Sequence, residues 1–453
     1  MMRALSLDAV ATLTHGKHYG ENAEISSVVI DSRRVRAGSL FVALRGERVD
    51  GHDYLRQAAE SGASAALVNR QCKELPGVIV DDSQRALADL ARDNRRAFRG
   101  PLIALTGSSG KTSTKEMLAA ILSCNASVLA TSGNHNNELG VPLTLLDISP
   151  QHAFAVIEMG AAKAGDIRYL CEFAQPDVAI LTNAQAAHLQ GFGSLDGVAK
   201  TKGEIFEALS PSGLAVINAD DRYYSQWQAQ ASHCRQSSFS LISSSADVYA
   251  SDISATAEGS QFTLHCAAGQ TEVLLPLSGR HMVANALAAA AAALEVGISL
   301  SQIAEGLGGV NSTAGRLFSQ RWGGITVIDD SYNANPGSVR AAIEVLAAKP
   351  GKSLLVLGEM AELGPDAEAL HRDVAAYARD AGVASCAFVG EFADVMAEEF
   401  GDAGRAFADK QALLGHLPTL LDNVNTVLVK GSRSSAMEEV VTALQQTLSG
   451  ENG

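Results

Sequence analysis

The segment LIALTGSSGKTSTKEML, from Leu102 to Leu118, determines how the middle of the chain folds. Its first residues are apolar and predict a buried strand that ends at Thr106. A loop of Gly, Ser and Lys follows, and helix-forming residues begin at Thr114. In this strand, loop and helix order, backbone N–H groups and the helix N-terminus bind phosphate.

The loop carries the groups that phosphate recognition requires. We expect Lys111 to reach the β- and γ-phosphates of a nucleotide and the Thr112 hydroxyl to ligate magnesium. The common pattern has glycine where Leu105 stands, so this loop is a shortened variant. A glycine-rich turn that only caps the helix is the alternative, but Gly-Lys-Thr after a buried strand is uncommon by chance. The predicted ATP-binding residues here are Gly107, Ser108, Ser109, Gly110, Lys111, Thr112 and Ser113.

The composition is that of a globular protein with several domains. The chain has 453 residues, of which 47% are hydrophobic and 19% charged. At roughly 150 residues per domain, this length suggests about three domains. The formal net charge of -15 argues against nucleic-acid binding, because phosphate backbones are bound by clustered Lys and Arg. The six cysteines are scattered without a CxxC pair, so we expect reduced, mostly buried thiols.

No segment indicates export or membrane insertion. The apolar run at the N-terminus is short and interrupted for a signal peptide. The longest apolar stretch, residues 286–294, is about half of the length that spans a bilayer. We therefore expect a cytoplasmic protein that does not insert into a membrane.

Alternating strand-like and helix-like segments predict an α/β fold with three domains. Residues 1–100 form a small α/β unit, and Pro101 opens a new strand at the boundary. Residues 101–312 contain a mostly parallel sheet of the phosphate-loop type, with a more polar, antiparallel extension at 232–278. Residues 313–453 alternate again and predict a second doubly wound, Rossmann-like sheet.

Polar residues at the ends of the central strands predict a metal site. Glu158 ends one predicted strand and His188 follows the next, on the side of the sheet where Thr112 lies. Nucleotide phosphates need a metal, and magnesium prefers oxygen ligands. Taken alone, Glu158 could cap a helix and His188 could be an ordinary loop histidine. Their joint placement favours the metal interpretation.

Lys202 lies in VAKTKGEIFEAL, which is a predicted helix. From the residues alone, a solvent-exposed lysine is the favoured interpretation. The alternative is an amine that nearby cations keep neutral, so that it reacts with carbon dioxide. The product is a carbamate, an anion able to order magnesium.

Longer motifs resemble the Mur ligases. The segments TGSSGKTSTKEM, GNHNNELGVPLTLL, VIEMGA, TNAQAAHLQGFGSLDGVAKTKGEIF, GRHMVANALAAAAA, AGRL and DDSYNANP occur in the order found in that family. DSRRVRAGSLFVALRGERVDGHDY near the start, and LGEMAELG and VLVKGSRSS near the end, extend the resemblance over nearly the whole chain. The chain is most similar to the member that joins D-alanyl-D-alanine to UDP-N-acetylmuramoyl-tripeptide.

The resemblance implies an ATP-dependent amide ligase of peptidoglycan precursor synthesis, with ATP and Mg²⁺ as cofactors. Its substrates would be UDP-N-acetylmuramoyl-tripeptide and D-alanyl-D-alanine, joined through an acyl phosphate. The N-terminal domain would bind the UDP-muramoyl substrate and the central domain ATP. The C-terminal domain would complete the ATP and D-alanyl-D-alanine sites. We also expect a monomer.

The resemblance assigns roles to residues that match its motifs. The implied catalytic residues are Lys111, Lys202, His188, Glu158 and Arg316. Lys202, as a carbamate, would join Thr112, Glu158 and His188 at the metal. Among the nucleotide contacts, Asn285 matches an adenine contact, Arg316 an arginine that reaches the γ-phosphate, and Asp330 a ribose contact. Met282 departs from the pattern, because many relatives have Asn there.

The resemblance also implies two groups of substrate-binding residues. The group for the UDP-sugar is Ser32, Arg33, Gly46, Asp50 and His52, and the group for peptide carbonyls and carboxylates is Asn134, Asn136, Asn137, Asn333 and Asn335. A surface loop with an Asx turn at Asp31 is the alternative for the first group. Asn-rich turns also form for purely backbone reasons, which is the alternative for the second.

Two other classes of protein share some of these features. Another ATP-dependent amide ligase, such as folylpolyglutamate synthase or a Mur ligase that adds an earlier residue, would keep the central motifs. It should lack the combination of GNHNNELG and DDSYNANP, which this chain has. A nucleotide switch or scaffold would keep the phosphate loop but would not need Lys202, Glu158 and His188 together.

Overall fold

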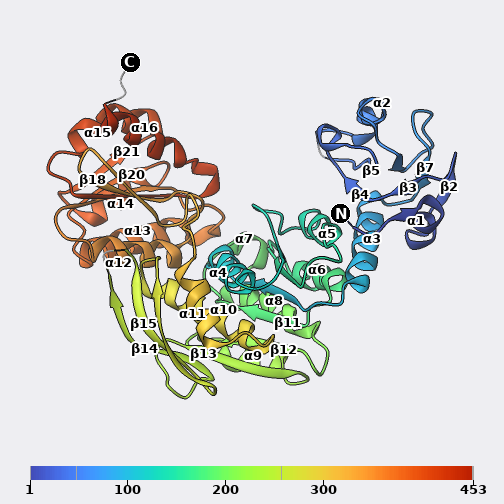
Figure 1. The fold of residues 1–453 in the computed structure, drawn as a ribbon. Helices are drawn as coiled ribbons and strands as arrows, with labels where there is room; N and C mark the ends of the chain where they lie inside the picture. The colour runs from blue at the N-terminus through green and yellow to red at the C-terminus, as the bar shows by residue number, and fades with distance from the viewer. Residues whose placement is uncertain (1, 47, 257, 451–453) are drawn as a thin grey trace.

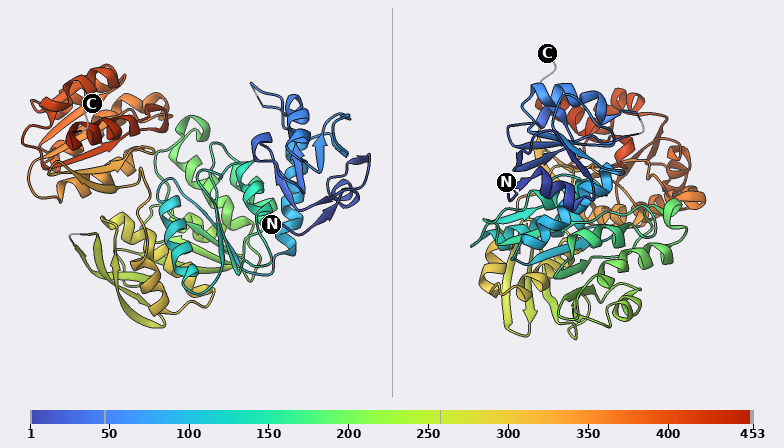
Figure 2. Two further views of the ribbon diagram at one scale, coloured as in Figure 1. Left: turned by 45° about the horizontal axis from the view of Figure 1, so that its top comes forward. Right: turned by 90° about the vertical axis from the view of Figure 1, so that its right-hand side faces the viewer.

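The computed structural model describes residues 2–46, 48–256 and 258–450. Three α/β parts follow one another along the chain, and the central part lies between the other two (Figure 1; Figure 2). Each part is built on its own larger sheet. The predicted α/β class, with its mostly parallel sheets, is confirmed. None of the described helices combines the length and the apolar character needed to cross a membrane.

The N-terminal part is a five-stranded sheet with helices packed against it. The strand order is β2-β7-β6-β5-β4, and only the β2 and β7 pair is antiparallel. All residues of β5 and β6 are buried, as expected for inner strands of a parallel sheet. The strands are β2 (Lys17–Tyr19), β4 (Ser27–Val29), β5 (Ser39–Val42), β6 (Ala65–Val68) and β7 (Gly77–Ile79), beside the short pair β1 (Leu5–Ser6) and β3 (Glu24–Ile25). The helices are α1 (Leu7–Leu13), α2 (Leu55–Glu60) and α3 (Ser83–Ala97).

The central part is a nine-stranded sheet in the order β16-β15-β14-β13-β12-β11-β8-β10-β9. Pairing is parallel from β9 to β14, and β14, β15 and β16 form an antiparallel extension. The strands are β8 (Leu102–Thr106), β9 (Val128–Ala130), β10 (Phe154–Glu158), β11 (Val178–Leu181), β12 (Leu214–Asn218), β13 (Arg235–Ser240), β14 (Val248–Ala255), β15 (Ser260–Cys266) and β16 (Gly269–Leu275). The helices are α4 (Lys111–Ser123), α5 (Gly140–Leu146), α6 (Asp166–Ala174), α7 (Leu189–Phe192), α8 (Leu195–Glu207), α9 (Tyr224–Gln230), α10 (Arg280–Glu295) and α11 (Leu300–Gly308).

Strand β8 packs against helices on both faces of the central sheet. Successive side chains of a strand point to opposite faces, and here all five are buried. Ile103 and Leu105 belong to a core with α4 and α10. Leu102 and Ala104 belong to a second core with α5, α6 and α8. The strand is therefore fixed from both sides, and the loop that follows it starts from a rigid point.

The C-terminal part is a six-stranded sheet in the order β17-β18-β22-β19-β20-β21, with only β17 antiparallel to its neighbour. The strands are β17 (Phe318–Trp322), β18 (Ile325–Asp330), β19 (Ser353–Gly358), β20 (Ser385–Val389), β21 (Gly404–Phe407) and β22 (Thr426–Lys430). The helices are α12 (Pro336–Ala347), α13 (Ala367–Asp380), α14 (Ala393–Phe400), α15 (Lys410–Leu420) and α16 (Glu438–Ser449).

The cysteines follow the sequence prediction only in part. All six are free, as expected. Cys171 and Cys386 are buried, but the other four are half-buried, so the prediction of mostly buried thiols is wrong. The half-buried thiols lie near loops and element ends, where packing is less complete.

Helix α3 is clamped to the central part by the buried side chain of Asn94. Its amide nitrogen donates to the backbone oxygens of Leu145 and Ile148, at 2.8 and 3.0 Å. These carbonyl groups lie at the end of α5, where a helix leaves its last acceptors without partners. The Asn94 side chain therefore gives hydrogen bonds to buried carbonyl groups, whose burial without a donor would be unfavourable.

We predict that Asn94→Ala lowers the free energy of unfolding by roughly 1–3 kcal/mol, because the buried Ile148 carbonyl loses its donor and the Leu145 carbonyl keeps the Ile148 N–H. Urea denaturation followed by circular dichroism measures this change. Asn22→Ala is the matched control, because Asn22 is exposed and its loss should stay within about 0.5 kcal/mol. A change at Asn94 no larger than the change at Asn22 would contradict the assignment.

Candidate active site

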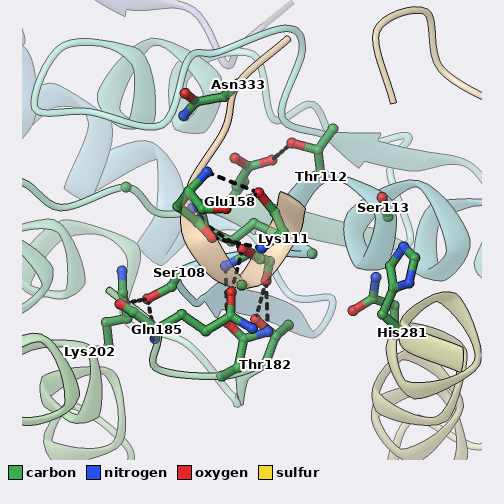
Figure 3. Close-up of a pocket in the computed structure, with 18 of the residues that line it drawn as sticks. Ser108, Lys111, Thr112, Ser113, Glu158, Thr182, Gln185, Lys202, His281 and Asn333 are labelled. Carbon is green, nitrogen blue, oxygen red and sulfur yellow. Dashed lines mark hydrogen bonds between the residues drawn. The ribbon is translucent and has the colours of Figure 1, made fainter. Parts of the chain in front are cut away.

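A cavity of about 720 Å³ lies beyond the carboxyl ends of the central strands, between the central and C-terminal parts. This is the edge where parallel sheets collect ligands. Figure 3 shows side chains of the phosphate loop, of β10 and of the C-terminal part around it. Of the sequence-predicted site residues, those that line it are Ser108, Ser109, Gly110, Lys111, Thr112, Ser113, Asn134, Asn136, Asn137, Glu158, His188, Lys202, Asn285, Arg316, Asp330, Asn333 and Asn335.

The phosphate loop requires glycine for two different reasons. Gly110 has a φ of 80°, in the left-handed region, and a Cβ there would lie 2.4 Å from the Asn285 side-chain oxygen. A Cβ at Gly107 would lie 1.8 Å from the Thr182 hydroxyl. Glycine therefore allows the loop to pass close to its neighbours before α4 begins at Lys111.

The loop is held by hydrogen bonds to the end of β11. The backbone N–H of Ser109 donates to the Asn183 side-chain oxygen at 3.0 Å, and the Thr182 hydroxyl donates to the Ser109 carbonyl at 2.7 Å. Lys111 donates to the Gly107 carbonyl at 2.8 Å, so its ammonium is folded over the loop. Burial lowers the pKa of Lys111, Glu158 raises it, and Arg316 lowers it further. Asn183 and Thr182 were not among the predicted site residues, although they follow a buried strand and could have been found by that rule.

Glu158 lies between two of the elements that form the site. The Thr112 hydroxyl donates to one carboxylate oxygen at 2.8 Å, and the Asn136 amide donates to the other at 2.8 Å. Figure 3 draws the bond to Thr112. Glu158 is 2% exposed, so its carboxylate is shielded from water. Hydroxyl and carboxylate oxygens are the ligands that magnesium prefers, and magnesium keeps several waters. Thr112 and Glu158 therefore fit the predicted magnesium site.

His188 is turned away from this pair. Its Nδ1 atom contacts the carboxylate of Glu362, which belongs to the C-terminal part. In the part of the chain that the structure describes, no three His, Cys, Asp or Glu side chains form a metal cluster. The structure therefore brings Thr112 and Glu158 together but pairs His188 with an acidic residue that the sequence did not indicate.

Lys202 is buried, at 2% exposure, so the expectation of a solvent-exposed lysine is wrong. The reason is the packing of α8, whose neighbouring residues from Val198 to Phe206 are largely buried. The Lys202 ammonium lies 5.8 Å from the centre of the Phe192 ring. Burial, together with the charge of Lys111, lowers the pKa of Lys202 well below its ordinary value. A neutral amine is the form that reacts with carbon dioxide.

The start of α10 forms the side of the cavity near Gly110. Asn285 is buried, and its amide nitrogen lies 3.8 Å from the sulfur of Met282, the residue that departs from the family pattern. His281 lies beside them, and burial and Lys430 lower its pKa to about 4. In the view of Figure 3, His281 and Lys202 lie on opposite sides of the phosphate loop.

The C-terminal part contributes a buried ion pair to the cavity. Lys430, which ends β22, donates to the carboxylate of Asp330, which ends β18, at 2.6 Å. Burial raises the pKa of Asp330, and Lys430 opposes this. The guanidinium of Arg316 stacks over the Tyr332 ring at 4.2 Å. Lys430 was missed, although it ends a buried strand in the motif VLVKGSRSS and the rule used for Glu158 would have found it.

The Asn residues divide into turn formers and groups that join elements. Asn137 accepts N–H bonds from Leu139 and Gly140 at the start of α5, which is a backbone role. Asn335 caps α12 by accepting from the Ser338 N–H, and its amide donates to the Ser109 hydroxyl at 3.0 Å. Asn335 therefore links the C-terminal part to the phosphate loop.

The predicted UDP-binding residues lie in the N-terminal part and outside this cavity. His52 is buried, and its ring contacts Asp50 at 2.6 Å and the Asn69 N–H at 3.1 Å. Ser32 is also buried and donates to the side chain of Gln57 at 2.9 Å.

Arg33 is the exposed member of this predicted set. Its side chain is 80% exposed and pairs with Asp31 at 2.8 Å. The Asx turn of the alternative interpretation is present, because Asp31 accepts the Arg33 N–H. The hydrogen bonds and charge of Arg33 lower the pKa of Asp31 to about 2. Gly46 closes a turn by donating its N–H to the Val49 carbonyl at 2.9 Å.

Comparisons with known proteins agree with this fold. Three family models match in succession: the Mur ligase family catalytic domain at residues 24–95, the Mur ligase middle domain at 105–293, and the Mur ligase glutamate ligase domain at 315–433. The UDP-N-acetylmuramoyl-tripeptide–D-alanyl-D-alanine ligase of Escherichia coli is 45% identical over 98% of this chain and 99% of its own length. The ligase of that name from Haemophilus influenzae is 39% identical over 99% and 100%.

Solved structures give the same result. MurF from Acinetobacter baumannii has a TM-score of 0.93 at 35% identity, covering 98% of this chain and 99% of that one. The MurF ligase of Thermotoga maritima, solved in complex with ADP, has a TM-score of 0.83 at 28% identity, covering 94% and 98%. The fold and the phosphate site define an ATP-dependent ligase that forms peptide bonds. Within that class, this chain belongs to the Mur ligase family.

We predict that Gly110→Ala lowers the affinity for ADP at least tenfold, because the new methyl group would meet Asn285 and the loop would have to shift. Isothermal titration calorimetry measures the affinity. Gly165→Ala is the matched control: Gly165 also has a positive φ, of 88°, but has nothing within 4 Å of the added Cβ. Equal ADP affinities for the two variants would contradict the close contact at Gly110.

Proposed function

We propose that this protein is the cytoplasmic, ATP-dependent ligase that joins D-alanyl-D-alanine to UDP-N-acetylmuramoyl-tripeptide in peptidoglycan precursor synthesis. The observation that carries the proposal is the convergence of Lys111, Thr112, Glu158 and Lys202 on one cavity with Arg316 from the C-terminal part. The names of the two relatives, which match almost the whole chain, support the choice of substrates.

The chemistry is amide formation driven by ATP. The terminal carboxylate of the tripeptide attacks the γ-phosphorus, which gives an acyl phosphate and releases ADP. The amine of D-alanyl-D-alanine then attacks the activated carbonyl carbon. The tetrahedral intermediate loses a proton and expels inorganic phosphate, which leaves the new amide bond. Each atom of the transferred phosphoryl group thus leaves as phosphate.

The protein contributes mainly position and charge to these steps. The first step brings a carboxylate toward phosphate oxygens, so negative charges repel in the transition state. Lys111 folds over the loop, from which it would reach the γ-phosphate, and Arg316 lines the same cavity from the C-terminal part. Preorganised cations of this kind stabilise the transition state of phosphoryl transfer.

The Thr112 hydroxyl and the Glu158 carboxylate would hold magnesium, which supplies positive charge to the phosphate oxygens when bound. Both groups are oxygen donors in a buried setting and form one hydrogen-bonded pair. His188 would join them after leaving Glu362. Lys202 as a carbamate would add an anionic oxygen donor, and its lowered pKa supports that modification.

The three parts would divide the substrates among them. Residues 1–100 would bind the UDP-sugar, and the exposed guanidinium of Arg33 supports this role, because arginine pairs with phosphate oxygens. Residues 101–312 would bind ATP. Residues 313–453 would complete the ATP and D-alanyl-D-alanine sites, with Asn333 and Asn335 facing the cavity.

Phosphate release by the purified protein tests the function. The protein is given ATP and magnesium, with UDP-N-acetylmuramoyl-tripeptide and D-alanyl-D-alanine supplied singly and together. We expect release only when both are present, with the mass of the nucleotide sugar raised by one dipeptide less one water. If an earlier muramoyl precursor or a folate stimulates release in place of this pair, the substrate assignment is wrong.

We predict that Lys202→Ala reduces turnover at least 100-fold and leaves ADP binding within about threefold, because Lys202, as a carbamate, would order the magnesium at the reacting γ-phosphate, which ADP lacks. Lys200→Ala is the control, since Lys200 is exposed on the same helix and should behave as wild type. Partial rescue of Lys202→Ala by a small carboxylate would support a carbamate. Unchanged turnover of Lys202→Ala would contradict this role for Lys202.

A further inference from the structure

Helix α4 carries a second lysine, Lys115, one turn after Lys111. Lys115 is 2% exposed and is absent from the cavity lining. Its ammonium donates to the Thr131 carbonyl at 2.6 Å and contacts the carboxylate of Glu116 at 2.8 Å. Burying a cation is unfavourable unless it is paired and hydrogen-bonded. A hydrophobic residue would fill the same space at lower cost, so the contacts of the ammonium are the feature to explain.

Thr131 connects Lys115 to the strand that carries Glu158. The Thr131 hydroxyl accepts the backbone N–H of Glu158 at 2.9 Å, and the Thr131 N–H donates to the Val156 carbonyl at 3.0 Å. Thr131 is 1% exposed, so these bonds are shielded from water. Thr131 therefore accepts a hydrogen bond from the Lys115 ammonium of α4 and, through the Glu158 N–H, fixes the backbone at the end of β10.

The chain from Thr131 then returns to the Glu158 carboxylate. Asn136 donates to that carboxylate through its side chain and accepts the Gly160 N–H at 2.8 Å through its carbonyl. Residues 131–137 are thus fixed at one end by Lys115 and at the other by the residues around Glu158. This segment also carries Asn134, which lines the cavity.

We propose that Lys115 is a positioning residue that fixes the segment 131–137 against α4, so that Glu158 and Asn136 keep their orientation toward the phosphate loop. This inference rests on the proposed function for its effect on magnesium but not for its effect on the segment. Without the ammonium, the Thr131 carbonyl has no donor from α4. The segment then moves away from the helix, and Glu158 loses its fixed distance to Thr112.

The test replaces Lys115 with methionine, which has a similar length but no charge. Hydrogen exchange followed by mass spectrometry reports on the peptide that covers residues 128–140. We expect exchange there to be at least tenfold faster in Lys115→Met, with little change elsewhere. Without magnesium, we expect the ADP affinity measured by calorimetry to stay within twofold of wild type. The increase in ADP affinity on adding magnesium should be at least tenfold smaller in Lys115→Met than in wild type.

Two neighbours on α4 provide matched controls. Thr114 is buried and its hydroxyl has no hydrogen-bond partner among the described residues, so Thr114→Val should behave as wild type. Glu116→Gln removes the charge of the other group that touches the ammonium and should also behave as wild type. A loss in Glu116→Gln equal to the loss in Lys115→Met would overturn the proposal, because the surface ion pair would then be the relevant contact.

Thr131→Val keeps the test decisive if Lys115→Met does not fold. This variant keeps the carbonyl but removes the acceptor for the Glu158 N–H, and we expect the same loss of magnesium-dependent affinity. The proposal would be overturned if hydrogen exchange in Lys115→Met were faster evenly along the whole chain. It would also be overturned if both the exchange and the magnesium dependence of ADP binding stayed as in wild type. If the wild-type protein shows no phosphate release with its substrates, the proposed function fails, while the exchange result still decides the role of Lys115.

Discussion

The hydrogen bond from the Thr112 hydroxyl to the Glu158 carboxylate is the contact on which the arrangement of the site depends. It joins the first turn of α4 to the end of β10 at 2.8 Å. Because β8 lies directly beside β10 in the sheet, the loop that follows β8 must end close to Glu158. The order of the strands thus decides which side chains share the cavity, and the packing of β8 on both faces keeps that order rigid.

A buried amine, Lys202, and a half-buried one, Lys111, give an acidic protein a local site for anions. The chain has a net charge of -15, so its overall field repels nucleotides and carboxylates. Lys111 and Lys202 lie close enough for the charge of Lys111 to lower the pKa of Lys202. Lys111 therefore disfavours the protonated form of Lys202. An anion placed between them relieves that repulsion, which is the electrostatic basis for binding phosphate, a carboxylate or a carbamate here.

Sequence reasoning found the parts of the site that follow from local order. The strand, loop and helix around Lys111 were predicted because glycine, lysine and apolar residues have strong local preferences. The predicted sheet edge also placed Glu158 correctly. The residues alone predicted an exposed Lys202, because its burial depends on how α8 packs, and only the family resemblance indicated it as a site residue. The pairing of His188 with Glu362 joins residues 174 positions apart. Contacts between parts of a chain depend on the relative placement of whole sheets, which no local pattern encodes.

Nucleotide binding would have to replace hydrogen bonds that the phosphate loop makes within the protein, including one to the C-terminal part. The Ser109 hydroxyl accepts from Asn335 and donates to Gln185, and Lys111 donates to its own loop. Phosphate oxygens would compete for the same donors. Binding then exchanges hydrogen bonds within the protein for hydrogen bonds to phosphate, so the net gain is smaller than the number of contacts suggests. Because Asn335 belongs to α12, this exchange couples the nucleotide to the position of the C-terminal part.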